Sequence, residues 1–179
     1  MTASPADLLQ SLIDATLKAG ADAADARLSE SASLSVEVRN GELESVEREE
    51  SRGLALRALV GRRQASVSGT DLSPAALKAL SERVVAMAKL APEDKYCGIA
   101  DASEIARDHP DLQLDSDDTP EAGELERRGR IMEDAAMAIP GVKQMSHAGA
   151  SWGTSSSWVA ASNGFAAHKT SGYSSMSAV

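Results

Sequence analysis

The sequence predicts an α/β fold of the α+β kind: a mixed or antiparallel sheet of hairpins, with helices packed on one face. Three observations support it: amphipathic segments with capping residues at their ends, stretches where apolar and polar residues alternate, and two Asn-Gly pairs between such stretches. A second, shorter α-β-β unit follows and reads as truncated at the end of the chain.

Three segments have the pattern of amphipathic helices. Ser4 and Ser73 are suited to be N-caps, and each is followed by a proline, which is favoured in the first helical turn. Gly20 is placed to end the first helix, and Pro92 to end the second. A third helix is predicted from Thr119-Pro120-Glu121 to Pro140-Gly141. Its expected inward residues are Leu125, Met132, Ala135 and Ile139.

The strands are predicted from alternation and from tight turns. Apolar residues of one parity between Ala26 and Val38 indicate a half-buried strand. Asn40-Gly41 then predicts a type I′ hairpin turn, because both residues tolerate positive φ. Return strands are expected over residues 42–50 and 54–60, a turn at Gly61-Arg62, and a short strand around Ala65 and Val67. Asn163-Gly164 predicts a second hairpin near the end of the chain.

Charge and composition divide the chain into three ranges. Residues 1–91 form the first predicted domain, residues 92–118 an acidic linker, and residues 119–179 the start of a second domain that is cut short. Nine acids and two bases lie between Pro92 and Thr119, which gives this stretch a charge of −7. Such a charge run is typical of a solvated loop.

The composition excludes several classes of protein. No run of about 18 apolar residues is present, which excludes a transmembrane helix. The first residues lack the basic and apolar regions of a signal peptide. Cys97 is the single cysteine, its role is not indicated, and no internal disulfide is possible, so we expect a cytoplasmic protein. The net charge of −9 argues against direct binding of nucleic acid, and no membrane partner is expected.

One motif resembles that of a hydrolase. Gly149-Ala150-Ser151-Trp152-Gly153 matches G-x-S-x-G, with His147 and His168 nearby. A nucleophile elbow requires a strand before the serine, a helix after it, and an acid between the serine and the histidine. A serine-rich, strand-like stretch follows Ser151, and no acid occurs after it. We therefore interpret the motif as a turn between strands.

No other chemistry is indicated by the residues. The three histidines, His109, His147 and His168, are far apart and form no metal-binding helix motif. Phosphate-binding glycine loops are absent, and the pairs Arg62-Arg63 and Arg127-Arg128 have no interleaved aromatic residues. We predict no catalytic, cofactor-binding or metal-binding residue in this chain.

Several segments together resemble the first domain of the TldD/PmbA family. They are Val38 to Glu44, Arg52 to Arg57, Val60-Gly61 and Asp71 to Pro74. Residues 161–165, Ala-Ser-Asn-Gly-Phe, resemble a second segment of the family. The segments occur in the family's order and span most of the chain, and they favour the PmbA branch, which is similar to TldE.

This resemblance implies a subunit of a cytosolic metallopeptidase complex that hydrolyses peptides or small proteins. Its TldD-type subunits hold zinc through an HExxxH motif in their C-terminal half, and they pair with PmbA-type subunits as heterodimers. HExxxH is absent here, so zinc is expected only in the partner subunit. The chain is expected to contribute subunit contacts in a heterodimer or homodimer, and walls of a chamber for an extended peptide substrate.

Two other functions stay open. The first is a non-enzymatic binding module, for example one that interacts with gyrase or an antitoxin, since the family is also linked to gyrase modulation. The second, less favoured by the motif's context, is an independent hydrolase that uses Ser151. Whether the protein's sequence contains HExxxH distinguishes a catalytic from a non-catalytic subunit.

Overall fold

The computed structural model describes residues 4–108, 110–115 and 118–179 and confirms the α+β class. Its helices are α1 (Pro5–Lys18), α2 (Pro74–Leu90) and α3 (Ala122–Met137), with a short 3-10 turn at Ala102–Glu104. Its strands are β1 (Ala23–Arg39), β2 (Glu42–Val60), β3 (Arg63–Gly69), β4 (Ala148–Ala161) and β5 (Ala166–Ala178). None of the helices in these ranges has both the length and the apolar character needed to cross a bilayer.

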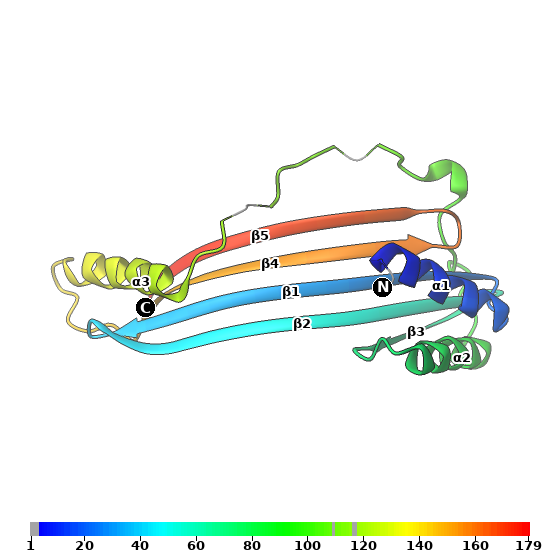
Figure 1. Cartoon of the computed structure of the whole chain (residues 1–179), viewed down its shortest axis with the longest axis horizontal. Helices are drawn as coiled ribbons and strands as arrows, with labels where there is room; N and C mark the ends of the chain where they lie inside the picture. Colours follow the sequence, from blue (N-terminus) through cyan, green and yellow to red (C-terminus); the bar gives the residue numbers. More distant parts are fainter. Residues whose placement is uncertain (1–3, 109, 116–117) are drawn as a thin grey trace. The chain divides into compact units, whose positions relative to one another are not determined.

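The five strands form one antiparallel sheet in the order β3-β2-β1-β4-β5 (Figure 1). β3 pairs with only part of β2, from Leu54 opposite Gly69 to Val60 opposite Arg63. Contacts divide the chain into two compact units. Unit 1 is residues 1–30, 52–110 and 156–169, and unit 2 is residues 31–51, 111–155 and 170–179. The units interleave along the chain, and the predicted domain boundaries at 91 and 118 stay a prediction.

The predicted caps of α1 and α2 are present. Ser4 accepts a hydrogen bond from the Asp7 N–H at 3.2 Å, and Ser73 accepts one from the Ala76 N–H at 3.3 Å. Gly20 follows α1 with φ +105°, a value that glycine adopts without strain. The sequence therefore sets both helix starts and the first helix end through local chemistry.

Unit 1 contains the larger apolar core. α1 and α2 bury their apolar faces against β1 and β2, and Ala160 and Trp158 of β4 also contact this cluster. The largest side chains with almost no exposed surface in this cluster are Leu9, Ile13, Leu28, Leu54, Leu56 and Val84. With few aromatic residues in the chain, aliphatic packing provides most of the apolar burial.

Unit 2 has a smaller core between α3 and the sheet. Leu125 of α3 packs with Leu34 and Val36 of β1 and with Ala150 of β4. The inward residues of α3 are Leu125, Gly129 and Glu133, spaced four apart. Of the four inward residues predicted for this helix, only Leu125 is buried, and Ile139 lies beyond the helix with 57% of its surface exposed.

The turns agree with the sequence, whereas one strand is longer than predicted. Asn40 and Gly41 have φ of 54° and 74°, as a type I′ turn requires. The predicted strands 42–50 and 54–60 form one continuous strand, β2, because residues 51–53 stay extended and make no turn. β1 likewise runs without a break through Ser31.

Candidate functional site

The serine of the G-x-S-x-G motif lies within β4, with extended chain on both sides. Its hydroxyl is 2.8 Å from the Ser175 hydroxyl of β5. A nucleophile elbow needs a sharp strand-to-helix turn, which this geometry does not provide. The prediction of a turn at this motif is also wrong, because residues 149–153 are strand.

A shallow hollow in unit 2 nevertheless brings Ser151, His147 and Glu37 together, with a volume of about 180 Å³. In the part of the chain that the structure describes, no hydrogen bond joins Ser151 to His147. His168 lies elsewhere, in unit 1, where its ring stacks on Trp158 with centroids 4.6 Å apart. The described residues thus include the three residue types of a triad, but they do not show the serine–histidine hydrogen bond that a triad requires.

Metal ligands do not converge within the described residues. No group of three or more His, Cys, Asp or Glu side chains in residues 4–108, 110–115 and 118–179 could hold a metal ion. His109 lies outside these ranges. Since the donor set does not fit zinc, we derive no metal-dependent step from this chain. Cys97 has a free thiol and is half-buried, and its backbone N–H donates to the Asp94 carbonyl at 3.0 Å.

The two arginine pairs are largely occupied by local partners. Arg63 donates to Glu93 at 3.2 Å and to the Lys89 carbonyl at 2.9 Å. Arg127 and Arg128 both donate to Glu124 of their own helix, at 2.8 Å and 2.9 Å. These contacts are typical of helix and turn surfaces and give no sign of a nucleic-acid interface.

The two arginines determine the titration of Glu124. Hydrogen bonds from Arg127, and then from Arg128, lower the pKa of this carboxyl group from 4.5 to about 2. The pKa of Glu124 is lower in the folded chain than in the unfolded one. The hydrogen bonds from the two arginines therefore stabilise the fold fully above pH 4.5, and this stabilisation is lost as pH falls through about 2. We expect carbon-detected NMR of the side chain to give a midpoint of about 2.

Replacing both arginines by glutamine is the control for this prediction. The Glu124 midpoint should then rise toward 4.5, because the two hydrogen-bond donors are removed. A midpoint of 4.5 already in the unsubstituted chain would show that the arginines are solvated.

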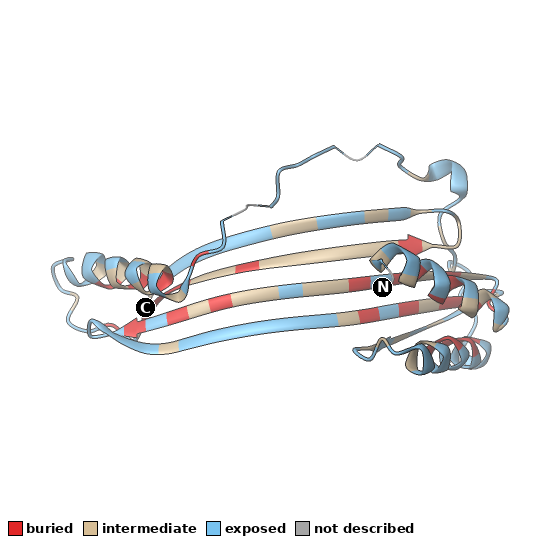
Figure 2. Cartoon of the chain, in the orientation of Figure 1, coloured by how far each residue is buried: buried red, intermediate tan, exposed pale blue. Residues whose placement is uncertain are grey.

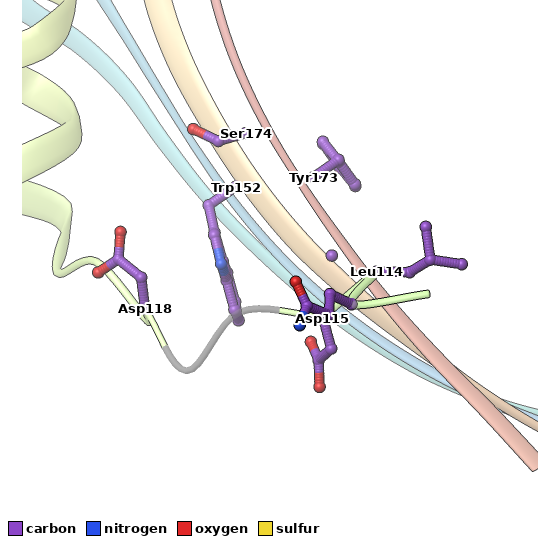
Figure 3. Close-up of a pocket in the computed structure, with 8 residues that line it drawn as sticks. Leu114, Asp115, Asp118, Trp152, Tyr173 and Ser174 are labelled. Carbon is purple, nitrogen blue, oxygen red and sulfur yellow. The ribbon is translucent and has the colours of Figure 1, made fainter. Parts of the chain in front are cut away.

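Two larger hollows lie one in each unit. In unit 2, Trp152 of β4, Ser174 of β5, and Leu114, Asp115 and Asp118 line a hollow of about 200 Å³. Figure 3 shows the Trp152 ring edge-on between Asp115 and Asp118. The Arg128 guanidinium reaches this region, 3.8 Å from Asp118 and 3.4 Å from the Ser174 hydroxyl. The hollow is smaller than the roughly 300–1,000 Å³ of pockets for drug-sized ligands.

The hollow in unit 1 is larger, about 480 Å³, and more apolar. Ile99, Ile105 and Phe165 line it, together with an ion pair in which Arg57 and Asp25 approach to 2.6 Å. The Asn163 side-chain amide donates to the Ala100 carbonyl at 2.9 Å, so the second Asn-Gly turn holds the segment that borders this hollow. Neither hollow assembles a set of reactive groups.

Carboxylates also fix the turns of the sheet, and sequence reasoning missed them. Glu133, only 4% exposed, accepts hydrogen bonds from the N–H groups of Asn40 at 2.6 Å and Gly41 at 2.8 Å. In unit 1, Asp22 accepts one from the Gly61 N–H at 2.7 Å. The sequence signal for Glu133 is its place four residues after Gly129 and eight after Leu125, on the apolar face of the helix.

Comparison with known proteins identifies the family. Residues 24–88 match the family model described as PmbA/TldA metallopeptidase domain 1. A relative from Escherichia coli O157:H7, named Metalloprotease PmbA, is 34% identical over 93 residues. The chain belongs to the TldD/PmbA family. A Haemophilus influenzae relative, named Metalloprotease PmbA homolog, is 34% identical over 102 residues.

This chain corresponds to only part of these family members. The two matches cover 52% and 57% of the chain but 21% and 22% of the relatives. The aligned segments therefore span about a fifth of the length of the relatives they match.

Solved structures of the family show the same fold. A putative modulator of DNA gyrase from Bacteroides thetaiotaomicron superposes with a TM-score of 0.85 at 24% identity, covering 99% of this chain and 41% of that one. TldE from Thermococcus kodakarensis superposes with a TM-score of 0.76 at 15% identity, covering 94% of this chain and 38% of that one. A putative modulator of a DNA gyrase from Thermotoga maritima superposes with a TM-score of 0.81 at 10% identity, covering 98% of this chain and 39% of that one. At these identities the likeness establishes the fold alone.

Proposed function

We propose that this chain is the N-terminal part of a TldD/PmbA-type metallopeptidase subunit that takes part in proteolysis of peptides or small proteins. The match of residues 24–88 to the first domain of PmbA/TldA metallopeptidases carries the proposal. Both relatives at 34% identity are named as metalloproteases or their homologues, which supports it.

The role of this region within the subunit is structural. The chain itself lacks the metal site, and it contributes subunit contacts and walls of the substrate chamber. The two hollows and the exposed sheet edges are features that such a role would use. The subunit is of the PmbA type, similar to TldE, and its zinc-containing partner in the cytoplasm is a TldD-type subunit. A homodimer is the other arrangement that we propose to test.

The test reconstitutes the pair. The whole protein that contains this chain is purified alone, and with the TldD-type subunit of the same organism, and cleavage of an unfolded peptide is measured. We expect cleavage only by the pair, and loss of cleavage after chelation with recovery on adding zinc. A glutamine in place of the glutamate of the partner's HExxxH motif is the matched control, and it should abolish cleavage without preventing assembly.

A different outcome would favour the binding-module alternative. The proposed function is wrong if three results occur together: the protein forms no complex with a TldD-type subunit, it leaves the peptidase activity of that subunit unchanged, and it cleaves no peptide by itself. Binding to gyrase or to an antitoxin in the absence of any peptidase would then become the leading interpretation.

A further inference from the structure

Half of β2 forms an open edge of the sheet. β3 pairs with β2 only from Leu54 onward, and β1 is the neighbour of β2 on its other side. Within the described chain, residues 42–51 therefore have no strand on their outer side, as Figure 1 shows for the part of β2 beyond β3. We call residues 42–51 the acidic edge. Its ten residues span about 33 Å, and their outward N–H and C=O groups are available for pairing.

The acidic edge is strongly charged. It contains five glutamates and one arginine, a net charge of −4 over ten residues. Glu44 pairs with Arg39 at 3.4 Å, and Glu50 pairs with Arg48 at 2.9 Å. In the described part of the chain, Glu42, Glu47 and Glu49 have no ion pair. Three carboxylates on this edge thus lack a cation.

Two apolar side chains lie among these charges. Leu43 and Val46 are each 47% exposed, on a stretch of β2 that Figure 2 shows as largely exposed. An extended partner would cover them while pairing with the backbone. The edge therefore offers hydrogen bonds, apolar contact and negative charge along one line, which are the components of strand addition.

The charges select the kind of partner. Glutamates on an edge strand oppose pairing with a second copy, because like charges across paired strands are destabilising. The same glutamates favour a strand with lysine or arginine at facing positions. The opposite edge, β5, lacks this property: residues 166–178 contain no acid, and the Gly172 N–H already donates to the Leu114 carbonyl at 2.8 Å.

We propose that the acidic edge of β2 binds an extended, basic segment of another polypeptide as an additional antiparallel strand. Only one part of this proposal rests on the proposed function, namely that the bound segment belongs to a peptide that the peptidase acts on. Strand addition itself requires neither cleavage nor a metal ion, so it can be tested by binding alone.

The probe is an acetylated, amidated nonapeptide with the sequence Thr-Lys-Val-Lys-Thr-Lys-Val-Lys-Thr, added to the isotope-labelled 179-residue chain. We expect amide exchange to slow at every second residue of the acidic edge, because only alternate N–H groups face an added antiparallel strand. The same peptide with glutamate in place of lysine should bind at least tenfold more weakly. A lysine peptide N-methylated at alternate residues should lose the protection.

Charge reversal in the protein provides the second readout. Glu47→Lys with Glu49→Lys should weaken binding of the lysine peptide at least tenfold, since two attractions become repulsions. Glu82→Lys with Asp108→Lys changes the net charge equally at exposed positions outside the acidic edge, and should leave binding within about twofold.

Three results would overturn the proposal. They are equal binding of the lysine and glutamate peptides, protection without alternation, and equal weakening by both pairs of charge reversals. The first would indicate no role for the edge charges, and the second and third would indicate diffuse association that is not specific to the edge. Reconstituted peptidase activity is measured separately, so failure here would leave the proposed function standing.

Discussion

Replacing Glu133 with alanine is expected to lower the free energy of unfolding by about 2–4 kcal/mol. Hydrogen bonds to a charged group contribute about 1.5–3 kcal/mol each, and the cost of burying the carboxylate offsets part of that sum. Glu133 accepts two such bonds, from the Asn40 and Gly41 N–H groups, at 2.6 Å and 2.8 Å. Its loss leaves both donors of the β1–β2 turn without their acceptor. Urea denaturation, followed by tryptophan fluorescence, measures the change.

The neighbouring acid supplies the control. Asp134 is exposed on the same helix, so Asp134→Ala should change the free energy of unfolding by at most about 0.5 kcal/mol. Glu133→Gln keeps one acceptor oxygen but turns an amide donor toward a backbone donor, so it should recover less than half of the loss. Equal stability of the Glu133→Ala and Asp134→Ala variants would mean that the turn is fixed by Asn40-Gly41 alone.

Local chemistry explains which parts of this fold are predictable from the sequence. N-caps, prolines in the first helical turn and the Asn40-Gly41 turn act over a few residues, so their positions follow from the sequence. The continuity of β2 through residues 51–53 depends on pairing with β1, which is not local. Predicted breaks at such places are therefore wrong even when the strands on both sides are correct.

The inward face of α3 shows a second limit. Apolar periodicity favours Met132, Ala135 and Ile139, whereas Gly129 and Glu133 are the buried residues. A glycine permits close approach and a glutamate binds a turn, and neither contributes to an apolar pattern. The same reason applies to the hollows: segments that pack against distant strands form them, and composition does not reveal that packing.

A methyl group added at Gly149 is expected to destabilise unit 2 strongly. A Cβ at this position would lie 2.6 Å from the Val36 carbonyl oxygen, a backbone atom that cannot rotate away. Overpacking of this kind costs about 1–3 kcal/mol, and we expect Gly149→Ala to fall near about 3 kcal/mol because the strand itself must shift. Thermal or urea unfolding measures the loss.

Gly123→Ala is the matched control, because nothing lies within 4 Å of a Cβ there and the residue is helical. It should raise the free energy of unfolding by up to about 1 kcal/mol through higher helix propensity. The two Gly→Ala changes should therefore have opposite signs. A neutral Gly149→Ala variant would show that β1 and β4 are held less closely than the 2.6 Å approach to the Val36 carbonyl implies. In that case, close approach of β1 and β4 would not explain the glycine at position 149, near the buried start of β4.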